Sequence, residues 1–277
     1  PPTTTLARPR RQRQMCIRDR PAIELAGGTA VHVALQADSF AVDWPAVEAE
    51  LGPRSRMIMI NSPHNPTGAT LDDADMRRLE TLAERYNLLV CSDEVYEHLS
   101  YDGLPHRSVL QYPGLRERSF AHFSFGKTFS VTGWKTGYCV APPALTSELR
   151  KVHQFVAFVA VTPVQQALAD FLAADPNYPA SLADFYQRKR DLFCAALAGS
   201  RFRLKPASGT YFQLLDYSEI SEVPDYQLWE RWTREIGVAS IPISVFYQRP
   251  PAQHHLRFCF AKSEATLKQA AEILCRI

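Results

Sequence analysis

The sequence lacks the features that mark disulfide-rich, metal-binding and membrane proteins. Its 277 residues hold six scattered cysteines, which form neither a CxxC pair nor a Cys/His pattern with metal-ligand spacing. No apolar run approaches the roughly 20 residues that a membrane-spanning helix needs. We therefore expect free thiols in a reducing cytoplasm, no metal site and no membrane span.

A basic surplus is also lacking once residues 1–20 are set aside. The formal net charge is +2, but these 20 residues hold six arginines against one acid, Asp19. The remainder carries 25 basic and 28 acidic residues, which argues against a nucleic-acid partner. An arginine-rich head can be a transit peptide or a nucleic-acid arm. Because residues 15–20 look like translated sequencing-adapter read-through, we expect a disordered or artefactual head instead.

Strand and helix signals alternate over residues 29–141, and internal repeats are absent. An amphipathic helix is expected over 71–86, and a shorter one begins at the N-cap Asp43. The strand signals lie at residues 29–35, 56–61, 88–91, 119–124 and 137–141. This rhythm predicts an α/β fold with a mostly parallel sheet. The apolar run 56–61 is typical of a strand buried on both faces.

The order of expected helices and strands changes toward the C-terminus. Helices are expected over 145–172, with a break at Pro163, and over 182–197. The later elements are expected at 202–217 (strand), 226–236 (helix), 238–241 (strand), 255–261 (strand) and 263–277 (helix). We interpret residues 21–178 as a large domain and residues 179–277 as a smaller α+β domain.

Side chains that can carry chemistry follow three of the expected strands. They are Asn65, Asp93, Tyr96, Ser124 and Lys127. Ligands of open α/β sheets bind at the carboxyl ends of the strands, so we expect these side chains to converge there.

These residues, and Arg257 later in the chain, also have ordinary explanations. Asp93 could be a helix N-cap, and Tyr96 a plain core aromatic. Lys127 could be a solvated surface lysine, and Arg257 a surface arginine on an edge strand. Only their order and separation along the chain favour a common site.

That order resembles a known family. The motifs are Asn-Pro-Thr-Gly at 65–68, Asp-x-x-Tyr at 93–96, Ser-x-x-Lys at 124–127 with Lys135 eight residues on, and Arg257. They resemble the class I and II aminotransferases of pyridoxal 5′-phosphate (PLP) fold type I, and look closest to the branch of bacterial methionine aminotransferase and the kynurenine and glutamine transaminases. The resemblance begins near Pro21 and implies a chain truncated at its N-terminus, with an incomplete large domain.

The resemblance implies PLP as the cofactor and assigns the residues around its ring. Lys127 is expected to form a Schiff base with PLP and, once displaced, to shuttle the proton of the substrate. Asp93 is expected to keep the pyridine nitrogen protonated. Asn65 and Tyr96 are expected to donate hydrogen bonds to the phenolate oxygen.

The phosphate and the substrate carboxylate have their own expected partners. Lys135 and the Ser124 hydroxyl are expected to bind the phosphate, with Thr128 as a further candidate. Arg257, together with Asn65, is expected to bind the substrate carboxylate. His64 and the stretch 209–211 also match the family, without a role that the residues themselves indicate beyond a close backbone approach at Gly209.

The implied function is transfer of an amino group from methionine, or another large apolar or aromatic amino acid, to a 2-oxo acid, by a homodimer of the full-length protein. Two alternatives stay open at this point. One is a β-lyase that acts on cysteine conjugates with the same site. The other is a non-catalytic sensor domain of a transcription regulator.

Overall fold

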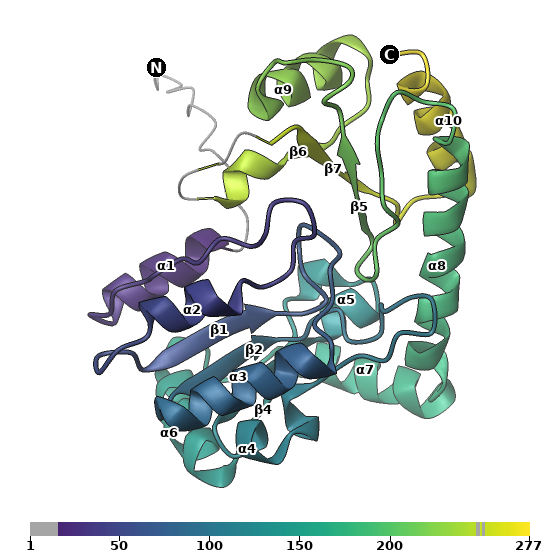
Figure 1. The fold of residues 1–277 in the computed structure, drawn as a ribbon. Helices are drawn as coiled ribbons and strands as arrows, with labels where there is room; N and C mark the ends of the chain where they lie inside the picture. The colour runs from purple at the N-terminus through teal and green to yellow at the C-terminus, as the bar shows by residue number, and fades with distance from the viewer. Residues whose placement is uncertain (1–15, 248–249, 251–252) are drawn as a thin grey trace, which may run out of the picture.

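The computed structural model describes residues 16–247, 250 and 253–277. The larger of its two sheets has the strand order β1-β2-β3-β4 (Figure 1). These strands are β1 (Met57–Asn61), β2 (Leu89–Asp93), β3 (Ser119–Ser124) and β4 (Gly137–Val140). The first three are parallel, and β4 runs antiparallel to β3. The expected α/β fold with a mostly parallel sheet is confirmed.

The strand register brings the three motif-bearing turns to one edge of this sheet. Asn61 at the end of β1 lies opposite Asp93 at the end of β2, and Asp93 lies opposite His122 near the end of β3. Because parallel strands present their carboxyl ends together, the segments that follow them leave the sheet side by side.

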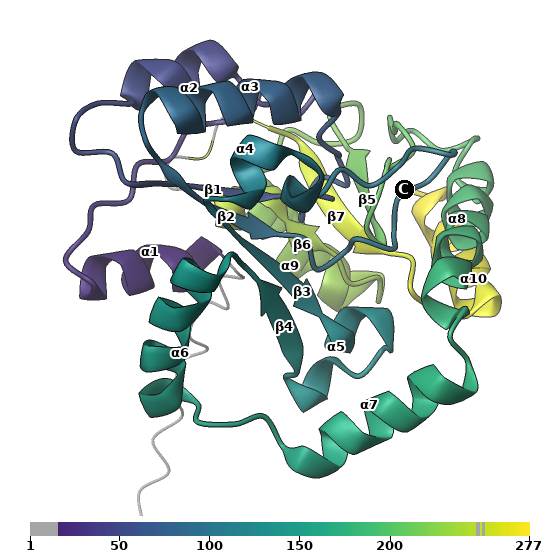
Figure 2. The same ribbon diagram turned by 90° about the horizontal axis from the view of Figure 1, so that it is seen from below.

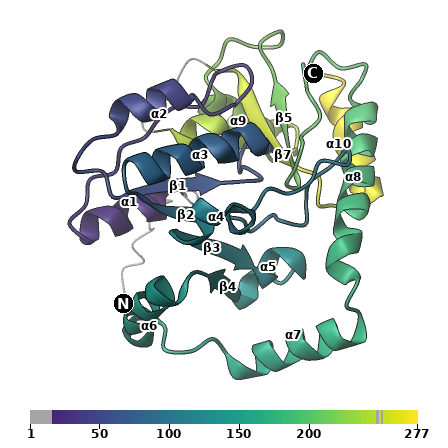
Figure 3. The ribbon, with the colours of Figure 1, turned by 60° about the horizontal axis from the view of Figure 1, so that its bottom comes forward.

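One face of the large sheet is covered by helices. These are α2 (Trp44–Glu50), α3 (Asp73–Arg85) and the short α4 (Pro113–Arg116). Helix α3 begins with a capping box between Asp72 and Asp75, which satisfies two backbone N–H groups that would otherwise lack partners. Its buried side chains are Met76, Leu79, Leu82 and Ala83. Figures 2 and 3 both show α2 and α3 on one side of the sheet and helices α6 (Pro143–Val156) and α7 (Thr162–Ala174) on the other.

The expectation that residues 56–61 are buried on both faces is wrong. Met57 and Met59, which point to the same face of β1, are 43% and 44% exposed. Strand β1 lies at the edge of the sheet, and no element within the described residues buries these two side chains. On β4, Tyr138 and Val140 are exposed in the same way.

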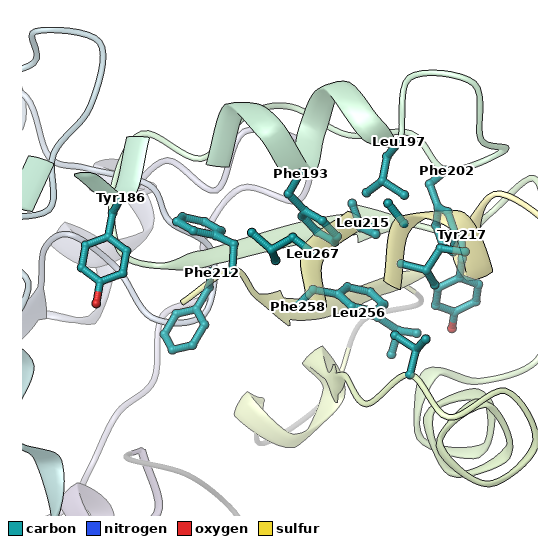
Figure 4. Packing of buried hydrophobic residues seen from close by; sticks show 14 of the residues in the cluster. Tyr186, Phe193, Leu197, Phe202, Phe212, Leu215, Tyr217, Leu256, Phe258 and Leu267 are labelled. Carbon is teal, nitrogen blue, oxygen red and sulfur yellow. The ribbon is translucent and has the colours of Figure 1, made fainter. Parts of the chain in front are cut away.

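The smaller sheet is antiparallel, in the order β5-β7-β6. Its strands are β5 (Phe212–Asp216), β6 (Ile241–Pro242) and β7 (His255–Cys259). Its helices are α8 (Tyr178–Ala196), α9 (Asp225–Glu235) and α10 (Glu264–Leu274). Figure 4 shows Phe193 of α8 and Leu197, which caps the C-terminus of this helix, directed toward Leu215 and Phe258 of the sheet. Fully burying such a side chain contributes about 1.5–3 kcal/mol, so this core holds α8 to the small sheet.

The remaining elements are short or peripheral. They are α1 (Cys16–Leu25), α5 (Phe125–Thr128) and the 3₁₀ turns η1 (Val109–Gln111), η2 (Thr132–Trp134) and η3 (Ile243–Phe246). None of the helices in the described ranges combines the length and the apolar character that a membrane crossing requires.

Four expectations about secondary structure differ from the structure. The strand expected over 202–217 is limited to β5. Residues 29–35 form no strand, because no neighbouring strand within the described residues pairs with them. The strand expected at 238–241 is reduced to Ile241 and Pro242, and the proline has no N–H to extend the ladder. Residues 16–20, expected to be disordered, belong to α1. The first 15 residues of the expected head lie outside the described residues.

One of the contacts that join the two sheets links the buried Arg190 of α8 to a loop of the large sheet. Arg190 is 3% exposed and binds both carboxylate oxygens of Asp102 at 2.7 Å. It also donates to the carbonyl of Ala207 at 2.8 Å. The core of the small sheet continues into the same loop through Leu99 and Tyr101. The domain boundary at residue 178 stays a prediction.

We expect Arg190→Met to lower the free energy of unfolding by about 1–3 kcal/mol, because it leaves the buried Ala207 carbonyl unpaired and removes the partner of Asp102. Urea unfolding followed by circular dichroism measures this loss. Arg188→Met, on the exposed side of the same helix, is the control and should change stability by less than about 0.5 kcal/mol. Equal losses in the two variants would contradict a joining role for Arg190.

Candidate active site

The turn that leaves β1 is held by the side chain of Asn61. Its Oδ1 accepts a hydrogen bond from the backbone N–H of Asn65 at 2.9 Å, and its Nδ2 donates to the backbone carbonyl of Asp93 at 2.8 Å. The peptide bonds Ser62-Pro63 and Asn65-Pro66 are both cis. The two hydrogen bonds fix Asn65 relative to the end of β2.

Asp93 and Tyr96 follow β2 at this edge. Asp93 precedes a turn rather than a helix, so the helix N-cap explanation is wrong; its Oδ1 accepts from Val95 N at 3.3 Å. Tyr96 is 1% exposed, and its hydroxyl has no hydrogen-bond partner among the described residues. A buried hydroxyl without a partner costs about 1–3 kcal/mol, so this one indicates a place for an acceptor. Burial and the neighbouring Tyr211 raise the pKa of Tyr96 well above its usual value, which keeps the hydroxyl a donor.

Lys127 lies on α5, directly after β3, and is only partly exposed. Its Nζ donates a hydrogen bond to the hydroxyl of Tyr211 at 3.1 Å. The same nitrogen lies 5.3 Å from the ring centroid of Tyr96 and 5.7 Å from that of Tyr211. The ordinary explanation of Lys127 as a solvated surface lysine is therefore wrong.

The residues expected to bind the phosphate, Ser124 and Lys135 with Thr128 as a further candidate, differ in their surroundings. Ser124 occupies the N-cap position of α5, but its side chain makes no capping hydrogen bond. The hydroxyl of Thr128 donates to the carbonyl of Ser124 at 3.2 Å, so Thr128 already has an intrahelical acceptor. Lys135 is exposed at a left-handed position, with φ of 55°, and no other described residue forms a hydrogen bond or ion pair with its ammonium group.

Arg257 reaches this edge from the small sheet. It lies on β7, the central strand of that sheet, and its Nη1 donates to Oδ1 of Asn65. It is 6% exposed, and no described carboxylate lies within ion-pair distance. Its guanidinium carbon lies 3.9 Å from the ring centroid of Phe212 and 5.5 Å from that of Phe246. Burial lowers the pKa of Arg257 from its usual value. The explanation as a surface arginine on an edge strand is wrong.

The segment before β5 explains how the small sheet approaches the large one. A Cβ on Gly209 would lie 2.6 Å from Cβ of Pro63 and 2.7 Å from the carbonyl of Leu99, so only glycine fits. The next residue, Thr210, donates its N–H to Leu99 at 2.9 Å with a φ of 65°. The close backbone approach expected at Gly209 is confirmed. It places Tyr211, two residues later, within hydrogen-bond distance of Lys127.

Sequence reasoning did not assign four residues that the structure adds to the site, namely Asn61, Tyr211, Phe212 and Phe246. A signal for Tyr211 was present, since it lies two residues after Gly209 in a stretch that matches the family. Its contact with Lys127, however, joins two residues that are 84 positions apart in the sequence. Phe246 lies in η3 beyond the short β6 and carries no motif.

The structure thus brings most of the predicted residues to one edge of the sheet and leaves one of them apart. Asn65 and Arg257 are in direct contact, Lys127 and Tyr96 adjoin one another, and Asp93 lies at the same sheet edge. Lys135 lies apart, on the exposed turn before β4. The donor set fits PLP, because it offers a primary amine, an unpartnered buried phenol, an unengaged lysine and a carboxylate at the end of β2.

Comparison with known proteins identifies the family. The model of aminotransferases of class I and II matches residues 20–274. The chain belongs to this family. It is 47% identical to methionine aminotransferase of Escherichia coli strain K12 over 254 residues, which cover 92% of the chain and 66% of that relative. The chain therefore spans about two thirds of the length of this relative.

Two further comparisons agree with this family. The chain is 31% identical to kynurenine–oxoglutarate transaminase 1 of Rattus norvegicus over 92% of its own length and 68% of the relative's. A solved structure of YbdL from Escherichia coli, described as having a methionine aminotransferase function, superposes with a TM-score of 0.90 at 47% identity. That superposition covers 93% of this chain and 68% of YbdL.

His64, in the turn after β1, yields a prediction about pH. Its Nδ1 lies 2.8 Å from the hydroxyl of Thr67, which also accepts the N–H of Ala69. Burial lowers the pKa of His64 to about 4. The unfolded chain binds a proton here below about pH 6.5, so it binds more protons than the folded chain between about pH 6.5 and 4. This histidine therefore makes the fold less stable as the pH falls through that window.

We expect His64→Gln to remove the loss of stability that this histidine causes as the pH falls. Relative to the unchanged protein, the free energy of unfolding of the variant should rise by about 1 kcal/mol for each unit that the pH falls within the window. Urea unfolding at pH 7, 5.5 and 4.5 measures the difference. His153→Gln, on the exposed surface of α6, is the control and should follow the unchanged protein. An identical pH dependence in His64→Gln and the unchanged protein would refute the assignment.

Proposed function

We propose that this protein is a PLP-dependent aminotransferase that moves the amino group of methionine, or of another large apolar or aromatic amino acid, to a 2-oxo acid. Membership of the family supports the reaction class. The 47% identity to a methionine aminotransferase supports the choice of amino acid.

One observation carries the proposal, namely the buried guanidinium of Arg257. A buried charge is stable only when it is paired and hydrogen-bonded. Here the described residues supply the hydrogen bond from Arg257 to Asn65 but no carboxylate. A ligand carboxylate completes the pair, because the planar guanidinium can bind both of its oxygens. The α-carboxylate of an amino acid or a 2-oxo acid meets this requirement.

The other residues of the site have complementary tasks. Lys127 would bind PLP through Nζ, Asp93 would face the pyridine nitrogen, and Tyr96 would donate its unpartnered hydroxyl to the phenolate oxygen. Lys135, with the Ser124 hydroxyl, would bind the phosphate. When bound, PLP supplies an electron sink for the bonds at the substrate Cα. As a free amine, Lys127 Nζ would take and return the Cα proton.

The substrate preference has support from the surroundings of Arg257. The rings of Phe212 and Phe246 flank the guanidinium. An amino acid held by its carboxylate at this point therefore meets apolar walls, which favour an apolar side chain over a charged one.

We also propose that the full-length protein is a cytoplasmic homodimer. Apolar side chains at the end of α6 and just beyond it, among them Phe155, Val156 and Phe158, are at least 75% exposed. Such side chains are typical of an interface. Four cysteines of the described residues, Cys139, Cys194, Cys259 and Cys275, form no disulfide, which supports a reducing compartment.

Lys127→Ala should abolish covalent attachment of PLP, because within the described structure Lys127 is the lysine whose amine lies beside the rings of Tyr96 and Tyr211. Borohydride reduction followed by peptide mass spectrometry locates the attached cofactor. Lys268→Ala, on the exposed side of α10, is the control and should keep attachment at Lys127. Attachment that persists elsewhere in the site of Lys127→Ala would refute the assignment.

Lys135→Ala should retain attachment but lose part of the preference for PLP over pyridoxal, which has no phosphate. A charge-assisted contact to phosphate contributes about 1.5–3 kcal/mol, so the preference should fall by roughly 10- to 100-fold. Absorbance titrations with the two aldehydes measure it. An unchanged preference would place the phosphate elsewhere.

Arg257→Met should weaken the binding of methionine to the PLP-loaded protein by about 100-fold, because a charge-assisted pair is lost. Methioninol, which lacks the carboxylate, is the control ligand and should bind both forms equally. Arg257→Lys should lie between the two, since it keeps the charge without the fork. Equal losses for methionine and methioninol would contradict the carboxylate role.

A further inference from the structure

The hydrogen bond between Lys127 and Tyr211 joins the proposed reactive amine to a residue that the proposed reaction does not yet use. We propose that Tyr211 is a positioning residue, whose hydroxyl holds the free amine of Lys127 where the amine meets the substrate Cα. This inference rests on the proposed function and adds a residue from the small sheet to the site.

The position of the Tyr211 hydroxyl is set by packing. Its ring meets Tyr96 edge-on with centroids 5.3 Å apart, meets Phe212 at 4.7 Å and lies 5.9 Å from Tyr186. Its backbone carbonyl accepts the N–H of Phe260 at 3.0 Å. Ring and main chain are therefore both anchored, and the hydroxyl presents a fixed point to Lys127 Nζ at 3.1 Å.

A lysine amine needs such a fixed point. Its four-carbon stem has about 2 kcal/mol of rotamer entropy, so a free amine samples many positions. Among the described residues, Tyr211 is the only hydrogen-bond partner of Lys127 Nζ, and no carboxylate forms an ion pair with it. A neutral phenol can orient the amine without the attraction that a carboxylate would exert on an ammonium group.

In the proposed reaction, Lys127 Nζ would take the proton from the substrate Cα, and bound PLP would supply the electron sink for the electron pair of the C–H bond. The ammonium formed at Nζ would then give up the same proton. Tyr211 neither gains nor loses a proton, and only sets where Nζ lies during both transfers.

The contact also couples the two sheets. Lys127 follows β3 of the large sheet, whereas Tyr211 directly precedes β5 of the small one. The amine is therefore oriented only while the small sheet is seated against the turn after β1, through the close approach at Gly209.

The first test uses the cofactor-free protein. Tyr211→Phe keeps the ring and removes the hydroxyl, and Tyr186→Phe removes a hydroxyl from the same aromatic cluster as the matched control. Each protein is treated with a trace of acetic anhydride, and peptide mass spectrometry gives the labelling of Lys127 relative to Lys135. The hydrogen bond that Lys127 Nζ donates holds the nitrogen against the Tyr211 hydroxyl, so its loss frees the amine to meet the reagent and should raise relative labelling of Lys127 about three- to tenfold.

Tyr186→Phe should label as the unchanged protein does. Labelling of Lys127 that is equal in Tyr211→Phe and the unchanged protein would overturn the inference. Because this readout needs no cofactor, it is independent of whether PLP attaches to Lys127, which is the separate test of the proposed function.

The second test uses the PLP-loaded protein with methionine and Cα-deuterated methionine. Tyr211→Phe should lower kcat about tenfold with little change in KM, and should raise the isotope effect on kcat, because a misplaced amine slows only the proton transfer. A loss confined to KM, or an unchanged isotope effect, would overturn the positioning role. The control Tyr186→Phe should show neither change.

Discussion

The account depends on the hydrogen bond between Arg257 of the small sheet and Asn65 of the large one. Arg257 is buried on the central strand of its sheet, and within the described structure it has no carboxylate partner. The guanidinium of Arg257 is therefore a buried cation at the junction of the two sheets. A ligand anion would complete its ion pair. Tyr96 interacts electrostatically with Arg257, and Lys127 lies beside the Tyr96 ring.

Two levels of organisation place these groups. Parallel pairing of β1, β2 and β3 brings the motif-bearing turns to one sheet edge, and the side chain of Asn61 ties the first turn to the second. The small sheet then approaches through a glycine that leaves no room for a side chain. Each unit alone holds part of the site, and the contacts between them complete the arrangement.

Much of this could be predicted from the sequence, because local rules govern it. Buried strands followed by turn residues indicate the carboxyl edge of a parallel sheet, and the N-cap at Asp43 and the helix over 71–86 follow from side-chain pattern alone. Local rules place Asn65, Asp93, Tyr96 and Lys127 at this edge, whereas their assignment to one site comes from the resemblance to the family. Their precise roles toward PLP remain predictions.

The rest depends on neighbours that a local pattern does not contain. Residues 29–35 alternate like a strand but lack a partner, and Met57 is apolar yet exposed, because burial is decided by what packs against a face. Tyr211 could not be assigned, since its hydroxyl meets Lys127 only after the two sheets dock. The missing partner of the Tyr96 hydroxyl is likewise a property of the packed site.

The most direct test of the central claim is a single turnover of the PLP-loaded protein with methionine and no 2-oxo acid. Arg257 would hold the methionine carboxylate while Lys127 moves the Cα proton. The account predicts that each loaded site yields one equivalent of the 2-oxo acid of methionine and one of pyridoxamine 5′-phosphate. Loaded protein that binds methionine but releases no 2-oxo acid would contradict it.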